Sequence, residues 1–265
     1  MRLLLTCLLC LLAWPAAAQL RVVTLAPSLS EIMLELDAAD LLVGVLDGGE
    51  RPTALAHLPS VGHYGQLEME RLLALKPDLL LLWPDSISAA QRQQLLGFGI
   101  PLFEAQPQKL EQLAEQFQAI GERVGRGETG RQRAAEFRQR LAALKQRYQR
   151  DVPLPVFYQI WNAPLYTVGG EQIISDALTV CGAKNVFADL KLPAPQVSVE
   201  AVLGRDPHVI IAGDNAQLDS WSKWPGLTAV RSRQLLVLPD KGIERPSLQM
   251  LDATERLCQA LAPLR

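Results

Sequence analysis

The sequence predicts an α/β protein of two doubly wound α/β lobes that are joined by one long backbone helix, with a ligand cleft between the lobes. Two observations lead to this fold class. Short apolar runs alternate with segments of helical periodicity on both sides of a long amphipathic stretch, and one segment occurs twice, beginning at Glu70 and at Glu200. Such alternation is typical of parallel sheets covered by helices. The repeated segment indicates that the two lobes are alike.

In the repeated segment a glutamate comes first and a proline follows seven residues later. One copy runs from Glu70 to Leu82 and the other from Glu200 to Ala212. Each copy is typical of a short helix that ends at the proline, followed by a buried strand. A carboxylate in the first turn gains about 0.3–1 kcal/mol from the helix dipole, which is one interpretation of both glutamates. The other is that Glu70 and Glu200 project toward basic groups of a two-fold partner.

The first lobe is expected to span residues 19–126. Ser28 or Ser30 is a candidate cap for its first helix, which we place near Glu31. The strands are expected at 21–25, 42–46, 79–83 and 100–103. The other helices are expected at 69–75, 89–96 and 110–124.

A single long helix is predicted within residues 127–152. Apolar side chains recur there in steps of three and four, which indicates one buried stripe on an otherwise solvated helix. The stripe consists of Ala134, Phe137, Leu141, Leu144 and Tyr148. Pro153 and Pro155 end the helix, and the second lobe covers 153–265. Beyond the repeated segment, this lobe is expected to contain strands at 156–160 and 235–238 and helices at 172–180 and 248–261.

Residues 1–18 have the pattern of a secretory signal peptide. Arg2 supplies a positive charge, an apolar run covers 3–14, and small residues at 16–18 form a cleavage site before Gln19. The apolar run is shorter than the ~20 residues that span a bilayer. The mature protein is therefore expected in an oxidising compartment.

Cleavage of that segment leaves two cysteines, Cys181 and Cys258. A disulfide between them is favoured because such bonds persist in oxidising compartments. Two independent buried thiols are the alternative.

Composition and motifs exclude several function classes. The chain carries 26 basic and 28 acidic residues, a balance that argues against nucleic-acid binding. His57, His63 and His208 are too far apart in sequence to indicate a local metal site. The segment 125–130 matches the pattern GxGxxG, but a helix precedes it, so we interpret it as a turn between helices. No catalytic motif is found, and we predict no enzyme; a hydrolase with a scattered triad is left open.

Several aromatic residues lie at expected strand ends or in loops. They include Tyr64, Trp83, Trp161 and Tyr166. Large aromatic side chains in such places can line a broad apolar pocket and stack on a flat ligand. The alternative for each is that it fills its local core. Their grouping favours the pocket.

Parts of the sequence resemble periplasmic cobalamin-binding proteins, the soluble components of vitamin B12 importers of the ABC type. The resemblance rests on residues 21–31, on the segment from Glu70 to Leu79 and on the long helix, and it covers nearly the whole mature chain. The segment that begins at Glu70 is shared with heme-binding and ferric-siderophore-binding members of the same helical-backbone class. The stretches 180–187 and 195–198, with Cys258, are more specific to cobalamin binding.

The resemblance implies a transport function in which the ligand is bound and delivered without being chemically changed. The protein would capture a corrinoid, cobalamin, in the periplasm and deliver it to a two-fold ABC permease in the inner membrane. It would be a monomer when free, with cobalamin as cargo and no cofactor of its own. A heme-binding or ferric-siderophore-binding protein of the same fold is the nearest alternative, and a secreted hydrolase is a more distant one.

The resemblance also implies roles for single residues. Tyr64, Trp83 and Tyr166 correspond to aromatic contacts with the corrin, and Arg245 corresponds to a polar contact. Trp161 is a further candidate for the pocket wall.

Other residues correspond to family positions that dock to the permease or form a disulfide. Glu70 and Glu200 match two carboxylates that meet arginines of the permease, and Cys181 and Cys258 match a disulfide pair. Gly48 and Ala194 depart from the pattern, because better-known members carry bulky aromatics there; these departures leave the choice of cargo open.

Overall fold

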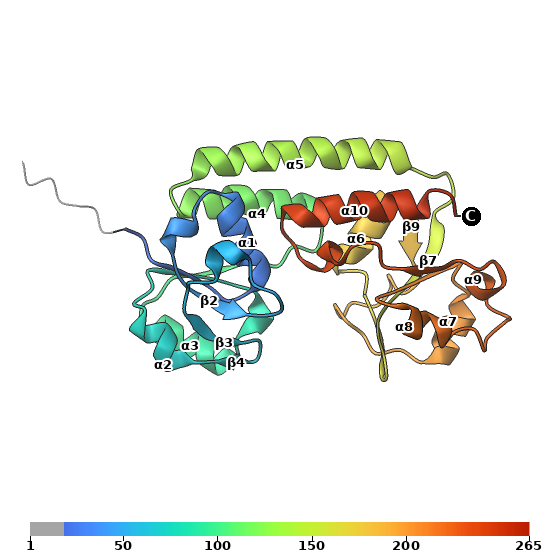
Figure 1. The fold of residues 1–265 in the computed structure, drawn as a ribbon, viewed down its shortest axis with the longest axis horizontal. Coiled ribbons are helices and arrows are strands. Elements are labelled where there is room, and N and C mark those ends of the chain that lie inside the picture. Colours follow the sequence, from blue (N-terminus) through green and yellow to red (C-terminus); the bar gives the residue numbers. More distant parts are fainter. Residues whose placement is uncertain (1–18, 265) are drawn as a thin grey trace, which may run out of the picture.

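Two α/β lobes lie beneath a layer of helices (Figure 1). The structure is a computed structural model that describes residues 19–264, so the predicted signal peptide 1–18 lies outside the described residues. The layer consists of α4 (Leu110–Arg123), α5 (Gly127–Tyr148) and α10 (Leu248–Leu261). Two lobes and one long helix confirm the predicted fold class. None of the helices in the described part of the chain has the length and apolar character that crossing a membrane requires.

The N-terminal lobe contains a six-stranded sheet in the order β4-β3-β2-β1-β5-β6. Neighbouring strands are parallel, except that β3 and β4 are antiparallel. The central strands β1 and β5 are buried along their whole length, as is typical of parallel strands covered on both faces. The strands are β1 (Val22–Thr24), β2 (Leu42–Asp47), β3 (Ser60–His63), β4 (Gln66–Leu67), β5 (Leu79–Leu82) and β6 (Leu102–Glu104). The helices are α1 (Pro27–Glu35), α2 (Met69–Ala74) and α3 (Ala89–Gly97), with 3-10 turns η1 (Ala39–Leu41), η2 (Thr53–Leu55) and η3 (Pro84–Ser86).

The C-terminal lobe contains a five-stranded sheet in the order β11-β10-β7-β8, with β9 beside β7. Strands β7 and β8 form an antiparallel hairpin, and the other pairs are parallel. The strands are β7 (Leu154–Asn162), β8 (Leu165–Thr167), β9 (Ala183–Asn185), β10 (Val209–Ala212) and β11 (Leu235–Val237). The helices are α6 (Ile173–Val180), α7 (Val199–Arg205), α8 (Asn215–Asp219) and α9 (Thr228–Arg231), with the 3-10 turn η4 (Lys241–Glu244).

Helix α1 begins at Pro27, four residues before the predicted start near Glu31. Neither Ser28 nor Ser30 caps it, and both lie buried inside its first turn. Proline suits the first helical position because its φ is preset and its missing N–H needs no partner. The proline therefore replaces the side-chain cap that the serines led us to expect.

Helices α4 and α5 pack against each other across the glycine-rich turn. The predicted apolar stripe of α5 is buried. A Cβ atom at Gly130 would lie 2.6 Å from the carbonyl oxygen of Phe117, so the close approach of the two helices requires glycine here. The turn between the helices lies at residues 124–126, with Gly125 at a φ of 72°, and residues 127–130 already form the first turn of α5, so the predicted turn is shorter than the segment 125–130.

Arginines tie the long helix layer to both lobes. At the start of α5 the Arg126 guanidinium lies 3.1 Å from a carboxylate oxygen of Asp40. Farther along, Arg140 lies 2.6 Å from Asp252 in α10. Exposed ion pairs of this kind are each worth up to about 1 kcal/mol. Their placement nevertheless fixes how α5 lies against the two halves.

Helices α4 and α10 each receive a cap from the opposite half of the chain. Glu35, at the end of α1, accepts a hydrogen bond from the Leu248 N–H at 3.0 Å, and Asp176 in α6 accepts one from the Leu110 N–H at 2.9 Å. At the start of α4 the Asp176 carboxylate also gains from the helix dipole. Burial raises the pKa of Glu35 to about 8, with the Leu248 N–H acting in the opposite direction. These reciprocal caps join the lobes at the helix layer.

A disulfide joins Cys181, at the end of α6, to Cys258 in α10. Both residues are buried. The bond confirms the prediction and holds α10 against the C-terminal lobe.

Candidate ligand-binding site

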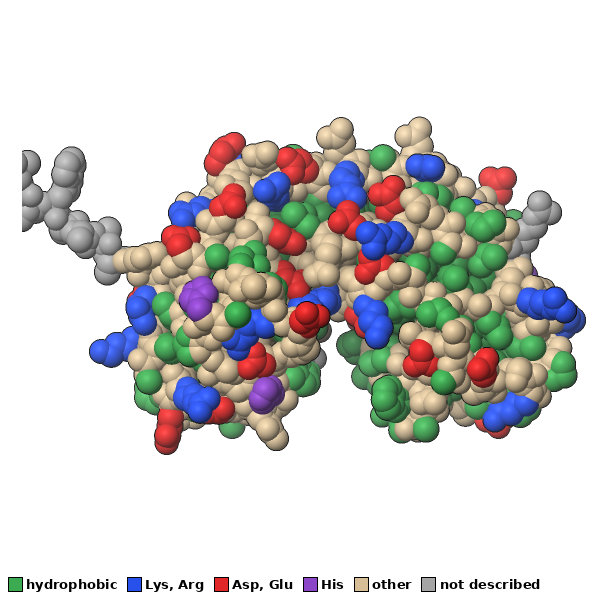
Figure 2. All heavy atoms as spheres, viewed as in Figure 1, with side chains coloured by type: hydrophobic (Ala, Val, Ile, Leu, Met, Phe, Trp, Pro, Cys, Tyr) green, Lys and Arg blue, Asp and Glu red, His purple; other side chains and the backbone are tan. Residues whose placement is uncertain are grey.

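A cleft separates the two lobes on the side away from α5, visible as the hollow in Figure 2. It contains a cavity of about 350 Å³. Its lining comes from the β3–β4 turn, the loops after β5 and β6, the start of α6, the loop after β9 and η4, so both lobes contribute. The lining residues are Tyr64, Trp83, Gln106, Pro107, Gln108, Glu171, Gln172, Ile173, Lys191, Pro193, Ile243, Glu244 and Pro246. The predicted cleft is therefore present.

A second cavity of about 270 Å³ adjoins the first on the N-terminal side. The two share Tyr64, Trp83 and Glu244, so they form one continuous site. Gly48 and Arg245 line only this second part.

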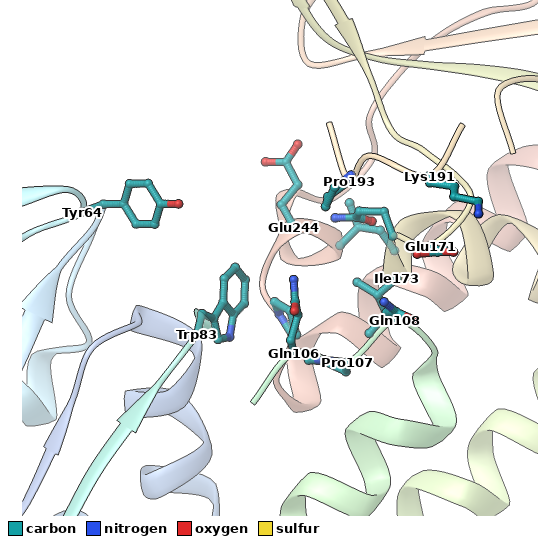
Figure 3. A pocket seen from close by; sticks show the side chains of 13 residues that line it. Tyr64, Trp83, Gln106, Pro107, Gln108, Glu171, Ile173, Lys191, Pro193 and Glu244 are labelled. Carbon is teal, nitrogen blue, oxygen red and sulfur yellow. The ribbon is translucent and has the colours of Figure 1, made fainter. Parts of the chain in front are cut away.

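Tyr64 and Trp83 supply the aromatic surface of the N-terminal wall. Tyr64 lies in the tight turn between β3 and β4, next to Gly65 with its positive φ angle, and it is 64% exposed. Trp83 follows the buried strand β5 directly and is partly buried. Both rings border the open space of the cleft in Figure 3. Both residues line the two cavities, so they present an aromatic surface to the cleft.

Glu244 and Arg245 follow each other at the end of η4 but have different partners. Glu244 accepts a hydrogen bond from the hydroxyl of Tyr158 at 3.1 Å. Burial, and then the neighbouring Glu244, raise the pKa of the Tyr158 hydroxyl well above its ordinary value, so this hydroxyl stays neutral. Arg245 forms an ion pair with Glu31 of α1. Among the described residues, its Nε has no hydrogen-bond partner.

Trp161 and Tyr166 lie on the β7–β8 hairpin and line neither cavity. The two residues are partners across the hairpin, and Trp161 is 55% exposed. The loop that carries Pro193 is hydrogen-bonded to the end of this hairpin, with the Gly169 N–H 3.1 Å from the Pro193 carbonyl oxygen. The hairpin is thus connected to a loop that lines the larger cavity, whereas Tyr64, Trp83 and Arg245 line the smaller cavity together.

Glu70 and Glu200 lie on the opposite side of the molecule from α5. Each is the second residue of its helix, α2 or α7, and both are exposed. Figure 1 places α2 on one lobe and α7 on the other, both far from the helix layer. The pKa of Glu200 is lowered by its own backbone N–H and by the Ser198 hydroxyl, which keeps this carboxylate charged. The two glutamates thus occupy equivalent places on one face.

No metal centre is found in the part of the chain that the structure describes. Within residues 19–264, no group of three or more His, Cys, Asp or Glu side chains is arranged to hold a metal ion.

The family model for periplasmic binding proteins matches residues 22–241. The chain belongs to the periplasmic binding protein family. A vitamin B12-binding protein of Yersinia pestis is 34% identical over 260 residues, which cover 97% of this chain and 91% of the relative. Among solved structures, the periplasmic vitamin B12-binding protein BtuF of Vibrio cholerae superimposes with a TM-score of 0.83 at 32% identity, covering 91% of this chain and 96% of that one. A periplasmic heme-binding protein from Pseudomonas aeruginosa gives a TM-score of 0.74 at 28% identity, covering 92% of both chains.

Much of the polar lining of this periplasmic binding protein was not predicted from its sequence. Gln106 and Gln108 flank Pro107 directly after β6, and Glu171 lies just before α6. Polar residues that follow a parallel strand lie at the carboxyl edge of the sheet, where α/β proteins bind ligands. That signal was available for the segment 106–108. Lys191 lies in an irregular loop, for which the sequence offers no comparable signal.

The two positions that depart from the cobalamin-binding pattern have different settings. Gly48 lines the smaller cavity, and a Cβ atom there would lie 2.8 Å from Cγ of Pro27. A larger side chain at 48 would therefore require the start of α1 to move. Ala194 is exposed and lines neither cavity. Only the change at Gly48 alters the space inside the site.

Proposed function

We propose that this protein captures cobalamin in the periplasm and delivers it unchanged to an ABC importer in the inner membrane. The main support is the open cleft with Tyr64 and Trp83 on its wall, in a chain that matches vitamin B12-binding proteins over nearly its whole length. Cobalamin is then cargo, and the protein needs no cofactor and catalyses no reaction. The mature protein carries out this function after the signal peptide 1–18 has been removed.

The two lobes enclose the ligand, and the layer of helices connects them. We assign residues 19–126 and 153–265 to the lobes and 127–152 to the connecting helix. The corrin ring stacks against Tyr64 and Trp83, and Trp161 and Tyr166 on the hairpin cover it from the C-terminal side. Aromatic contacts of this kind bury a large area at a small entropic cost, because each ring has few rotatable bonds.

Arg245 acts as a polar contact at the inner end of the site. Its ion pair with Glu31 holds the guanidinium in place. The Arg245 side chain is 28% exposed and lines the smaller cavity, so its accessible part can donate to an acceptor on the ligand.

Titration of the purified mature protein with cyanocobalamin tests the cargo. We expect saturable one-to-one binding, accompanied by quenching of tryptophan fluorescence. Light scattering is expected to show that the protein is a monomer. The absence of binding at micromolar concentrations of both components would contradict the proposal.

Glu70 and Glu200 act as the two docking points for a two-fold permease. They lie on equivalent helices of the two lobes, on the face away from α5. Charges at the rim of an interface contribute mainly to orientation and association rate. A single monomer with one carboxylate per lobe can therefore meet one arginine on each permease subunit.

Transport into vesicles that contain the permease tests the docking role. The double variant Glu70→Ala, Glu200→Ala is expected to bind cyanocobalamin as tightly as the parent protein but to support less uptake. Unchanged uptake would contradict the docking role and would leave helix-end stabilisation as the role of both glutamates.

Heme is the second candidate cargo. The Tyr64 hydroxyl is exposed in the cleft and can ligate iron, and the heme-binding protein from P. aeruginosa is 28% identical. A competition of hemin against cyanocobalamin separates the two. Cobalamin as cargo predicts little displacement by hemin and no Soret shift; a Soret shift that Tyr64→Phe abolishes would favour heme.

A further inference from the structure

The polar groups of the larger cavity are three amides, two carboxylates and one ammonium group, together with the Tyr64 hydroxyl and the Trp83 indole N–H. The amides belong to Gln106, Gln108 and Gln172, and the charged groups belong to Glu171, Glu244 and Lys191. Figure 3 shows Glu244 in the cleft, with Trp83 to one side and Pro193 to the other, and Glu171 and Lys191 on the far wall.

The charges of this wall are only partly compensated within the protein. Glu244 accepts a hydrogen bond from the neutral hydroxyl of Tyr158, which leaves its negative charge in place. Within residues 19–264, neither Glu171 nor Lys191 takes part in an ion pair. Arg245 offers no net charge to a ligand, because Glu31 is paired with it. The ligand therefore meets two carboxylates and one ammonium group.

Carboxylates accept hydrogen bonds and donate none. A ligand group that faces Glu171 or Glu244 must therefore supply an N–H or O–H. A primary carboxamide does so and is neutral, whereas a ligand carboxylate has no donor and carries the same charge as the wall. Like charges that are brought together in a partly desolvated site repel more strongly than in water.

We propose that Glu171 and Glu244 select ligands with a neutral carboxamide periphery and reject ligands that bear carboxylates at the same places. This inference rests on the proposed function and refines it. Cobalamin carries primary amides around its corrin ring, so the wall matches the intact vitamin. Corrinoids with a hydrolysed amide, and iron porphyrins with their carboxylate side chains, are disfavoured by the same two residues.

The test compares cyanocobalamin with its monocarboxylic derivatives, in which one peripheral amide has become a carboxylic acid. The isomers are measured separately by isothermal titration calorimetry at pH 7.5. We expect at least one isomer to bind the parent protein about ten-fold more weakly than cyanocobalamin. In the double variant Glu171→Gln, Glu244→Gln, that ratio is expected to fall to about two-fold, because the glutamines keep the size and the acceptor oxygens without the charge.

Two further variants make the outcome decisive. Lys191→Gln removes the one positive charge of the wall and is expected to increase the ratio, the opposite direction from the glutamate variants. Glu128→Gln, an exposed site at the start of α5, is the matched control and should leave the ratio unchanged.

Equal affinity of the parent protein for cyanocobalamin and for every isomer would overturn the inference. So would a ratio that neither the glutamate variants nor Lys191→Gln alters. These results leave cobalamin binding itself intact and thus contradict only the selection. If the parent protein binds neither cyanocobalamin nor its derivatives, the proposed function is contradicted. This inference, which rests on that function, is then contradicted as well.

Discussion

Replacement of Glu35 by glutamine is expected to remove a pH dependence from the stability of the joint between the lobes. Glu35 caps α10 through the Leu248 N–H, and burial raises its pKa from 4.5 to about 8. Glu31 and Asp252 act in the same direction as burial, while the Leu248 N–H and Arg133 oppose it. At neutral pH the folded protein therefore holds a proton on Glu35 that the unfolded chain has released.

The sign follows from this difference in bound protons. The stabilisation by protonated Glu35 is complete below about pH 4.5 and is lost as the pH rises through about 8. Between these values the free energy of unfolding falls by at most about 1.4 kcal/mol per pH unit. From pH 5 to pH 8 the limit is about 4 kcal/mol, and we expect about 2 kcal/mol because the carboxyl group is not fully buried. Glutamine keeps an acceptor oxygen for the Leu248 N–H and does not titrate.

Urea unfolding, followed by tryptophan fluorescence at several pH values from 5 to 8, measures this effect. The parent protein should lose stability with rising pH, and the Glu35→Gln variant should lose about 2 kcal/mol less. The Glu115→Gln variant, exposed on α4, is the control and should follow the parent protein. Parallel curves for the parent and Glu35→Gln would show that this carboxyl group is ionised in the folded protein and would refute the reasoning.

Two other substitutions have effects that can be estimated from the structure. Removal of the disulfide by Cys181→Ala with Cys258→Ala opens a loop with a sequence separation of 77 and should lower the free energy of unfolding by about 4.5 kcal/mol at 25 °C in the chain-entropy model; urea unfolding measures this, and a loss below about 1 kcal/mol would contradict that model. Trp83→Ala should weaken cyanocobalamin binding by about 2 kcal/mol, or about 30-fold, as truncation of an aromatic anchor does; an unchanged dissociation constant in calorimetry would place the corrin elsewhere in the cleft.

The sequence predicted the long elements well and the short ones poorly. Helix α10 has the predicted bounds of 248–261, and the apolar stripe of α5 is buried as its spacing indicates. Strands β3, β4, β8 and β9 were missed; each contains a polar residue, and none has a continuous apolar run like those of β5 and β10. The start of α1 was misplaced because two serines suggested a cap where Pro27 already supplied a favourable first turn.

The candidate site was predicted in part. Tyr64 and Trp83 were found because aromatic residues at strand ends are unusual in a sequence with few aromatics, and Arg245 was found only through the resemblance to cobalamin-binding proteins. Trp161 and Tyr166 were predicted to contact the ligand; they lie on a hairpin and line neither cavity, so their contact with the ligand stays a prediction. Nothing in the local sequence indicates where a hairpin will project.

By itself the sequence determined two similar α/β halves, a long helix between them and an acidic residue at the same place in each half. These features depend on local periodicity and on repetition, which are present along the chain. Only the tertiary structure decided that Glu35 caps a helix of the other half and that Glu171 and Glu244 face one cavity. Such contacts join residues distant in sequence, and they form because buried polar groups and helix ends need partners wherever the packing of the lobes places them.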